Sequence, residues 1–194
     1  MKEEWKRSAR REMRLKLESL TGAARLNATR SVMKQVQRHS LFKTARVVGF
    51  YASIDWEIDL QELSELCLDS ERIVALPRWN ASQSQFEFAV VDALEQLQPG
   101  RYGIMEPESE CRALLPQELE LVLVPGLAFS RKGDRLGRGA GYYDRLLKHN
   151  RGTRWGVCHA FQLVSGVPRQ EWDVRMDAVI TPDEWIEVEA GKKQ

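Results

Sequence analysis

The sequence Leu121-Val-Leu-Val-Pro-Gly126 contains the most apolar run of the chain, and this run decides the fold. Four branched apolar residues that end at a Pro-Gly pair are typical of a short, buried strand. A loop rich in glycine and arginine follows, with the sequence GDRLGRGAGYYD over residues 133–144, and the pattern predicts a helix from about residue 141 to 148. A buried strand, a loop and a helix in this order are typical of an α/β fold.

The rest of the chain alternates between the apolar periods of helices and strands. Helices are expected at residues 2–20, from Thr21-Gly22 to about His39, and at residues 59–69, and the inward-facing residues expected in the first two are Trp5, Met13, Leu17, Leu20, Leu26, Val32 and Val36. Strands are expected at residues 46–52, 72–77 (ended by Pro77), 86–91, 153–158, 178–181 and 185–188, with a hairpin turn at 80–85. We therefore expect one domain over residues 1–194, of the three-layer α/β/α class with a mostly parallel central sheet.

The loop at residues 133–144 has the composition of an anion-binding loop. Its glycines at positions 133, 137, 139 and 141 permit positive φ, so successive backbone N–H groups can point into one concavity. Arg135 and Arg138 lie in the same loop, and the N-terminus of the helix expected after it adds free N–H donors. The loop is no P-loop, because no Gly-Lys-Ser/Thr follows, and Tyr142 stands where a dinucleotide fingerprint needs its third glycine.

Asp144 lies in the first turn of that expected helix, and its carboxylate has two possible roles. A carboxylate there complements the helix dipole, which requires no further function. The alternative is a magnesium ligand, because magnesium in phosphate sites uses one or two carboxylates together with phosphate oxygens. The sequence leaves both readings open.

Composition and charge narrow the classes of partner. The 194 residues carry a net charge of +1, yet residues 1–46 hold 13 Lys and Arg against 4 Asp and Glu, and residues 131–154 hold 8 against 2. Two basic segments that meet at one site favour a small polyanion such as a nucleotide. The sequence contains no apolar stretch of about 18 residues, so no membrane span is expected. The N-terminus lacks the apolar region of a signal peptide. The three cysteines are scattered along the chain, which favours a reducing cytoplasm.

At the loop the chain resembles the 5-formyltetrahydrofolate cyclo-ligase family, and the resemblance covers nearly the whole sequence. Its strongest part is Pro125-Gly-Leu-Ala-Phe129 followed by residues 133–144. Further pieces occur in the family's order at Lys6–Arg10, Ser53–Asp59, Leu76–Arg78, Tyr102–Pro107 and Trp172–Asp177. The resemblance implies an α/β fold like that of sugar-phosphate isomerases and CoA transferases, and a monomer that acts on a reduced folate, with no nucleic acid or membrane partner.

The resemblance also implies roles for individual residues. The ATP-binding residues are Lys6, Arg7, Ser8, Ala9, Arg10, Arg135, Leu136, Gly137, Arg138, Gly139, Ala140, Gly141, Tyr142 and Tyr143. The substrate-binding residues are Arg10, Ala52, Glu57, Arg138, Gly139, Ala140, Gly141 and Tyr142. The implied catalytic residues are Arg138 and Lys6, and Asp144 and Asp177 are the implied magnesium ligands.

The implied reaction is the ATP- and Mg²⁺-dependent cyclisation of 5-formyltetrahydrofolate to 5,10-methenyltetrahydrofolate, with release of ADP and phosphate. Phosphorylation of the formyl oxygen gives an iminophosphate, which N10 attacks as phosphate leaves. Phosphoryl transfer needs positioning and charge neutralisation more than a protein nucleophile, and the loop, the arginines and Lys6 offer both. Glu57 has two interpretations: a carboxylate that hydrogen-bonds the donor edge of the pterin, as the resemblance implies, or a surface carboxylate at the end of a strand.

Two other functions remain open from the sequence. A sugar-phosphate isomerase-like enzyme on the same fold would need a general base and no ATP. An RNA-binding protein would use the basic N-terminal helix and would lose affinity steeply with salt. Of the remaining aromatic residues, Tyr142 and Tyr143 cannot both point inward from a helix, and one is expected to reach the ligand, whereas Trp172 is expected to pack in the interior. His159 follows a strand, and entry into the site is its less favoured reading.

Overall fold

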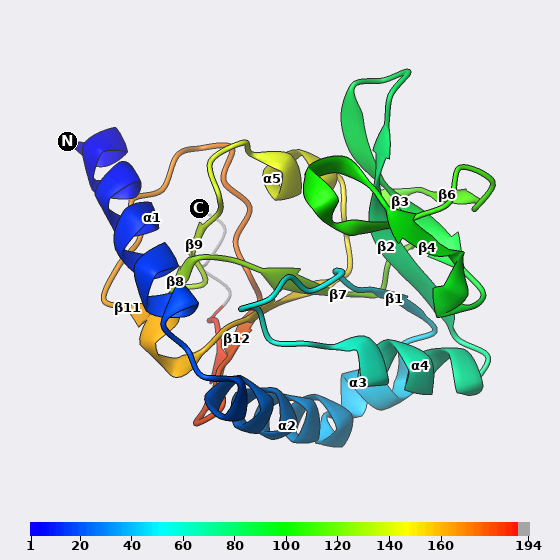
Figure 1. The fold of residues 1–194 in the computed structure, drawn as a ribbon, viewed down its shortest axis with the longest axis horizontal. Coiled ribbons are helices and arrows are strands. Elements are labelled where there is room, and N and C mark those ends of the chain that lie inside the picture. Colours follow the sequence, from blue (N-terminus) through cyan, green and yellow to red (C-terminus); the bar gives the residue numbers. More distant parts are fainter. Residues whose placement is uncertain (190–194) are drawn as a thin grey trace.

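The computed structural model describes residues 1–189 and has a large mixed sheet at its centre (Figure 1). Its strands are β1 (Val47–Gly49), β2 (Ile73–Asn80), β3 (Gln85–Val91), β6 (Ala113–Leu114), β7 (Leu121–Pro125), β10 (Thr153–Val157), β12 (Ala178–Ile180) and β13 (Trp185–Glu187). Their order across the sheet is β13-β12-β10-β7-β1-β2-β3-β6. The strands from β12 to β2 run parallel, and β13, β3 and β6 pair antiparallel at the edges. The predicted α/β class with a mostly parallel central sheet is confirmed.

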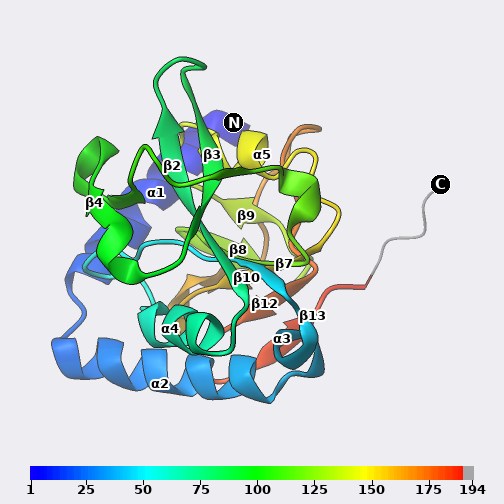
Figure 2. The same cartoon turned by 90° about the vertical axis from the view of Figure 1, so that its right-hand side faces the viewer.

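The helices and two smaller sheets surround this sheet. The helices are α1 (Lys2–Glu18), α2 (Gly22–Arg38), α3 (Ser40–Thr44), α4 (Gln61–Asp69) and α5 (Tyr142–Leu146), and the smaller sheets are β11-β8-β9 and β4-β5, formed by Leu163–Val164, Ala128–Ser130, Arg135–Leu136, Leu97–Pro99 and Met105–Pro107. In Figure 2, α2, α3 and α4 lie on one side of the main sheet and α5 lies on the other. The basic helix α1 lies outside this arrangement, beside β8, β9 and β11 (Figure 1).

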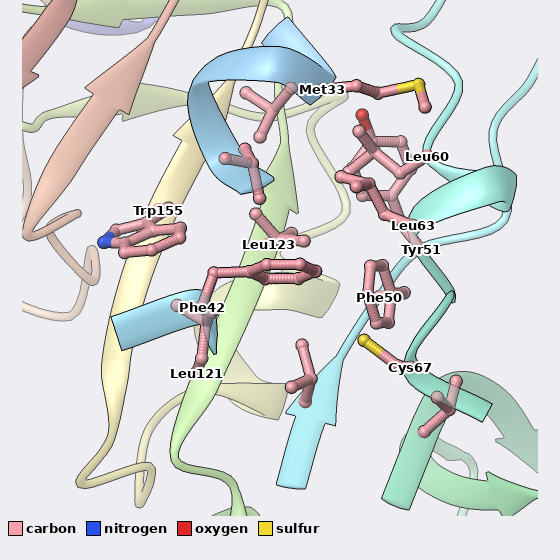
Figure 3. Close-up of a cluster of buried hydrophobic side chains, with 14 of the residues drawn as sticks. Met33, Phe42, Phe50, Tyr51, Leu60, Leu63, Cys67, Leu121, Leu123 and Trp155 are labelled. Atoms are coloured by element: carbon pink, nitrogen blue, oxygen red, sulfur yellow. The ribbon is translucent and has the colours of Figure 1, made fainter. Parts of the chain in front are cut away.

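Strand β7 shows why the sheet is buried on both faces. Its residues alternate between two hydrophobic clusters, with Leu121 and Leu123 in the cluster under α2–α4 and Val122 and Val124 in the cluster that includes Leu146 of α5. All four are fully buried. Figure 3 shows Leu121 and Leu123 together with Trp155 of β10 and aromatic side chains of the neighbouring segments. The expected apolar run therefore lies in the middle of the molecule.

Proline 77 does not end the strand expected at residues 72–77, so that prediction was wrong. Strand β2 continues to Asn80, and Pro77 pairs with Phe88 of β3. A strand tolerates proline where no ladder hydrogen bond needs its missing N–H group. The carbonyl of Ala75 accepts a hydrogen bond from Phe50 on the β1 side. Pro77, two residues later, directs its nitrogen to that same side, where β1 has already ended at Gly49.

The apolar pattern was also wrong for two residues of the N-terminal helices. Met13 and Leu17 of α1 are buried as expected, but Trp5 is 37% exposed and Leu26 of α2 is 49% exposed. Lys6 is buried in place of Trp5, because its ammonium group pairs with a carboxylate of another segment. A buried ion pair thus replaces the expected apolar contact near the start of α1.

The remaining element boundaries differ by a few residues. Helix α5 ends at Leu146, so it is shorter than the helix expected to residue 148, and β1 covers only residues 47–49 of the strand expected at residues 46–52. The hairpin turn at residues 80–85 is confirmed by the pairing of β2 with β3. Within residues 1–189, no helix has both the length and the apolar character needed to cross a membrane. One domain was expected over residues 1–194. Residues 190–194 of that range lie outside the part of the chain that the structure describes.

Gly156 in β10 provides a test of the packing between the two sheets. A Cβ atom at this position would come within 2.5 Å of Cε1 of Phe129, which is itself fully buried. We expect Gly156→Ala to lower the free energy of unfolding by about 1–3 kcal/mol, because overpacking displaces buried neighbours. The control is Gly22→Ala at the start of α2, where nothing lies within 4 Å and the same change should stabilise by about 0.4–1 kcal/mol. Urea unfolding followed by circular dichroism measures both; equal effects of the two variants would contradict this packing.

Candidate functional site

A cavity of about 450 Å³ lies where several strands of the main sheet end. Pro125 and Gly126, at the carboxyl end of β7, form part of its wall, and Tyr51 and Ala52, which follow β1, form another part. The carboxyl ends of parallel strands are the usual place for ligands in open α/β sheets. The other lining residues come from α1, the segment between β1 and α4, β2, β3, the segment 102–106 and the segment 135–146. They are Arg14, Glu57, Pro77, Phe86, Tyr102, Ile104, Met105, Glu106, Arg135, Gly137, Arg138, Ala140, Gly141, Tyr142, Tyr143, Asp144 and Leu146.

The glycine loop bends through left-handed conformations and lies against α1. Gly139 and Gly141 have φ angles of +116° and +65°, which L side chains rarely adopt. Gly141 is the residue before α5, and it allows the chain to turn into that helix. The Arg10 side chain of α1 donates from Nε to the carbonyl of Gly137 at 3.0 Å, and a Cβ at Gly139 would lie 3.5 Å from the same guanidinium. The loop and the N-terminal helix, far apart in sequence, therefore form one surface.

Two arginines of the loop form ion pairs beside the cavity. Arg135 donates to Asp144 at 3.1 Å, and Arg138 donates to Glu57 at 2.7 Å. The Arg135 side chain is only 5% exposed, and its Nε atom is buried without a hydrogen-bond partner. An unpaired donor on a buried cation costs free energy, so a further acceptor at this position would be stabilising. Leu136, which lies between Arg135 and Arg138 in the sequence, does not line the cavity and packs in a cluster with Met13 and Leu17 of α1.

Glu57 is a buried carboxylate on the wall of the cavity. Burial raises its pKa above the usual range, and the Arg138 guanidinium and the Ile54 N–H group, which donates at 3.2 Å, offset only part of that rise. Two tyrosines, the buried Tyr51 and the half-buried Tyr143, lie close enough for the Glu57 charge to raise their pKa values further, beyond the larger effect of their own desolvation. Around Glu57 the site is therefore an apolar, aromatic environment in which one arginine, Arg138, pairs with the carboxylate.

The adjacent tyrosines diverge, as expected from their position. Tyr143 packs against both large hydrophobic clusters, with the Arg135 guanidinium 5.4 Å from its ring centre. Tyr142 points to the other side, where its hydroxyl lies 2.6 Å from the hydroxyl of Tyr102 and its ring contacts Phe86. Tyr102 is 65% exposed and belongs to the segment 102–106, so a pair of hydroxyl groups joins that segment to α5.

The N-terminal helix contributes a second charged group next to the loop. Lys6 donates to Asp173 at 3.1 Å, and the N–H group of the next residue, Val174, donates to Asp144 at 3.3 Å. Asp144 and Asp173 therefore lie near one another, each beside a basic side chain. Of the other expected residues of α1, Arg7 and Ser8 are exposed and Ala9 packs against the small sheet.

Asp177, the second expected magnesium ligand, is not beside Asp144. Its carboxylate accepts two hydrogen bonds from the Arg154 side chain and one from the Arg154 N–H group. Arg154 pairs with Val122 near the start of β7, so Asp177 lies at the amino ends of the strands and the cavity lies at their carboxyl ends. Within residues 1–189 no cluster of three or more His, Cys, Asp and Glu side chains could hold a metal ion alone.

Several neighbours of the site were not identified as site residues from the sequence. Arg14, Phe86, Tyr102 and Met105 line the cavity, and Asp173 reaches Lys6. Tyr102 and Asp173 belong to segments that carry the family resemblance, so the sequence could have identified them as site residues. Arg14 follows Lys6 and Arg10 at a spacing of four on the same helix face, and this spacing could have identified it as well.

Two further expectations concerned single aromatic residues. Trp172 is 68% exposed, so the expectation that it packs in the interior was wrong. The turn that carries it is held by Asp173, whose carboxylate accepts from both Lys6 and the Gln170 N–H group. His159 is buried and its Nε2 lies 2.9 Å from the carbonyl of Trp56; it is not among the cavity residues.

A parallel-sheet fold with an apolar cavity next to an arginine-rich glycine loop defines the protein as an α/β enzyme with a small-molecule site. Residues 2–182 match the model of the 5-formyltetrahydrofolate cyclo-ligase family. The chain therefore belongs to this family, whose members are ligases.

The relatives agree with this assignment over most of their length. The 5-formyltetrahydrofolate cyclo-ligase of Escherichia coli K12 is 35% identical over 149 residues, which cover 73% of this chain and 82% of the relative. The cyclo-ligase of Mus musculus is 26% identical, with 92% and 94% covered. Among solved structures, the 5,10-methenyltetrahydrofolate synthetase of Aquifex aeolicus superposes with a TM-score of 0.86 at 31% identity, covering 97% of this chain and 95% of that one.

The raised pKa of Glu57 predicts how its removal changes the pH dependence of stability. A carboxyl group with a raised pKa in the folded state binds more protons than it does in the unfolded chain, so stability falls as the pH rises between the two pKa values. We expect the wild type to lose stability relative to Glu57→Gln as the pH rises from about 4.5, the usual pKa, towards neutral. The difference between the two urea-unfolding curves isolates this effect, because all other carboxyl groups are shared. A difference that is independent of pH would mean that Glu57 has an ordinary pKa.

Proposed function

We propose that this chain catalyses the ATP- and magnesium-dependent cyclisation of 5-formyltetrahydrofolate to 5,10-methenyltetrahydrofolate, with release of ADP and phosphate. The observation that carries the proposal is the contact between two parts of the site. The apolar cavity with Glu57 adjoins the loop of Arg135 and Arg138, and Arg10 of α1 closes the same loop from outside. The uncharged rings of a folate and a polyphosphate can therefore lie side by side.

The nucleotide site is proposed at the loop and the facing side of α1. Lys6, Arg10, Arg135 and Arg138 supply positive charge, and the backbone N–H groups of Gly137, Gly139 and Gly141 supply hydrogen bonds at positions that have no side chain. The buried, unpartnered Nε of Arg135 supports this placement, because it offers a donor that an oxygen of the ligand would satisfy. Lys6 and Arg138 are proposed to neutralise the charge that develops as the phosphoryl group transfers.

The folate site is proposed in the cavity itself. Glu57 offers a carboxylate acceptor that matches the adjacent N–H donors of a pterin ring, and Ala52, Tyr142 and Phe86 offer apolar contact for the rings of the substrate. In this position the 5-formyl oxygen faces the loop. It attacks the γ-phosphorus of ATP and ADP leaves. N10 then attacks the formyl carbon and loses its proton to solvent, and phosphate leaves to give the methenyl product. The protein supplies orientation and charge neutralisation and no covalent nucleophile.

Magnesium fits this site only together with the phosphates. Magnesium is commonly bound by one or two carboxylates and by substrate phosphate oxygens, and Asp144 and Asp173 offer two carboxylates on the loop side of the site. Both are paired with basic side chains that a polyphosphate would attract. We therefore propose Asp144 and Asp173 as the carboxylates that hold the metal, which would neutralise phosphate charge. Asp177 lies at the other ends of the strands, against Arg154.

The deciding experiment is the conversion itself. Purified protein with 5-formyltetrahydrofolate, ATP and magnesium should produce the ultraviolet absorbance of the methenyl product, and omission of ATP should abolish it. Release of one ADP per product, measured with a coupled enzyme assay, checks the stoichiometry. A folate-independent isomerase would turn over without ATP, and an RNA-binding protein would give no turnover and a steep loss of affinity with salt. Absence of the chromophore with all three components present would refute the proposal.

The carboxylates predict two different outcomes among three matched Asp→Asn variants. Asp144→Asn and Asp173→Asn should raise the magnesium concentration needed for half-maximal activity, because each removes one charged ligand. Asp177→Asn should leave that concentration unchanged and instead lower stability by about 0.5–2 kcal/mol, since it loses a partly exposed bidentate contact with Arg154. Magnesium titration of activity and thermal melting of all three variants separate these effects. If only Asp177→Asn raised the magnesium concentration needed for half-maximal activity, Asp177 would be the metal ligand and Asp144 and Asp173 would not.

A further inference from the structure

The cavity is lined by three arginines, and two of them are already paired. Arg135 holds Asp144 and Arg138 holds Glu57. The third carboxylate of the lining, Glu106, accepts from the backbone N–H groups of Trp79 and Arg101. Arg14 makes no hydrogen bond or ion pair with any residue of the described range 1–189. The cavity therefore has one cation that no internal carboxylate neutralises.

Arg14 is positioned by the helix that carries the other basic residues of the site. Lys6, Arg10 and Arg14 follow one another at intervals of four on α1, so they form a row along one face of the helix. At about 1.5 Å per residue, Arg14 lies about 12 Å along the axis from Lys6. Lys6 reaches Asp173 and Arg10 reaches Gly137, whereas Arg14 borders the cavity. The row thus runs from the proposed metal and phosphate region to the proposed folate site.

The burial of Arg14 also differs from that of the other charged residues in the lining. Glu57 and Asp144 lie in the interior of the site, with side chains 13% and 19% exposed. Arg14 is exposed, and Met13 beside it on α1 is buried against the small sheet. Its guanidinium therefore lies where the cavity meets solvent. A ligand that enters this cavity with its uncharged rings first would leave a charged end at this place.

We propose that Arg14 binds a carboxylate of the glutamate portion of the folate substrate. This inference rests on the proposed function, because it takes a reduced folate as the occupant of the cavity. The pterin and aminobenzoyl rings of a folate are uncharged, and its glutamate is the anionic end. A guanidinium matches a carboxylate with two parallel hydrogen bonds. Arg14 is the free partner for that end, and it determines specificity for glutamate-bearing folates.

The test compares substrates with and without the glutamate. Arg14→Ala should raise the KM for 5-formyltetrahydrofolate about fivefold to tenfold with little change in kcat, because an exposed charge-assisted contact is lost outside the reacting atoms. For 5-formyltetrahydropteroate, which lacks the glutamate, wild type and Arg14→Ala should have the same KM. Arg14→Lys should fall between the two, since an ammonium keeps the charge and loses the bidentate geometry. The control is Arg11→Ala, an exposed arginine of the same helix that does not line the cavity.

Three results would overturn the inference. A rise in the KM for ATP with the folate KM unchanged would place Arg14 at the nucleotide. An equal loss for the substrates with and without glutamate would mean that Arg14 acts on the rings or on the helix. An effect of Arg11→Ala as large as that of Arg14→Ala would reduce both to general electrostatic attraction.

A binding measurement keeps the test independent of turnover. Calorimetric titration of 5-formyltetrahydrofolate into wild type and Arg14→Ala, without ATP, should show weaker binding in the variant. If the wild type binds the folate and makes no methenyl product, the proposed function is wrong. The role of Arg14 is then still decided by the titration, because weaker binding in Arg14→Ala would support it. If both proteins bind the folate equally, the role of Arg14 fails while the proposed function is unaffected.

Discussion

The burial of β7 on both faces is the constraint on which the rest of the structure depends. A strand with apolar residues at every position must be covered on both sides, and Leu121 to Val124 are covered by α2–α4 on one side and by α5 with its neighbours on the other. Covering both faces leaves only the ends of the strand open. At the carboxyl end the chain turns at Pro125-Gly126, and these two residues form part of the wall of the cavity.

The second requirement is that α1, which does not cover the main sheet, is held at that cavity. Met13 and Leu17 bury its apolar face against the small sheet beside the loop. Apolar packing alone would leave rotation about the helix axis weakly determined, since it is not directional. The polar contacts of Lys6 and Arg10 are directional, and they join α1 to Asp173 and to Gly137. The basic side chains thus orient the helix as well as providing positive charge for a ligand.

The sequence predicted those features that depend on local pattern. The apolar run at Leu121–Val124, the helix periods and the glycine loop are visible because each is set by neighbouring residues. Residues whose role depends on distant contacts were not visible. Pro77 remains in a strand because β1 is short, Lys6 is buried because Asp173 lies beside it, and Asp177 is drawn to Arg154 by the register of β10 and β12. These facts depend on strand order, which a single sequence does not encode locally.

The charges of the site explain how one small region can be both compact and ready to bind a polyanion. Arg135 and Arg138 beside an apolar cavity would repel each other and lose hydration if they were unpaired, and Asp144 and Glu57 compensate them. In the proposed nucleotide site, a phosphate would compete for the same guanidinium groups, and each arginine that turned to the phosphate would release its carboxylate. The proposed binding of the anion and of the metal would then be coupled, because Asp144 is released to the cation when Arg135 turns to the phosphate.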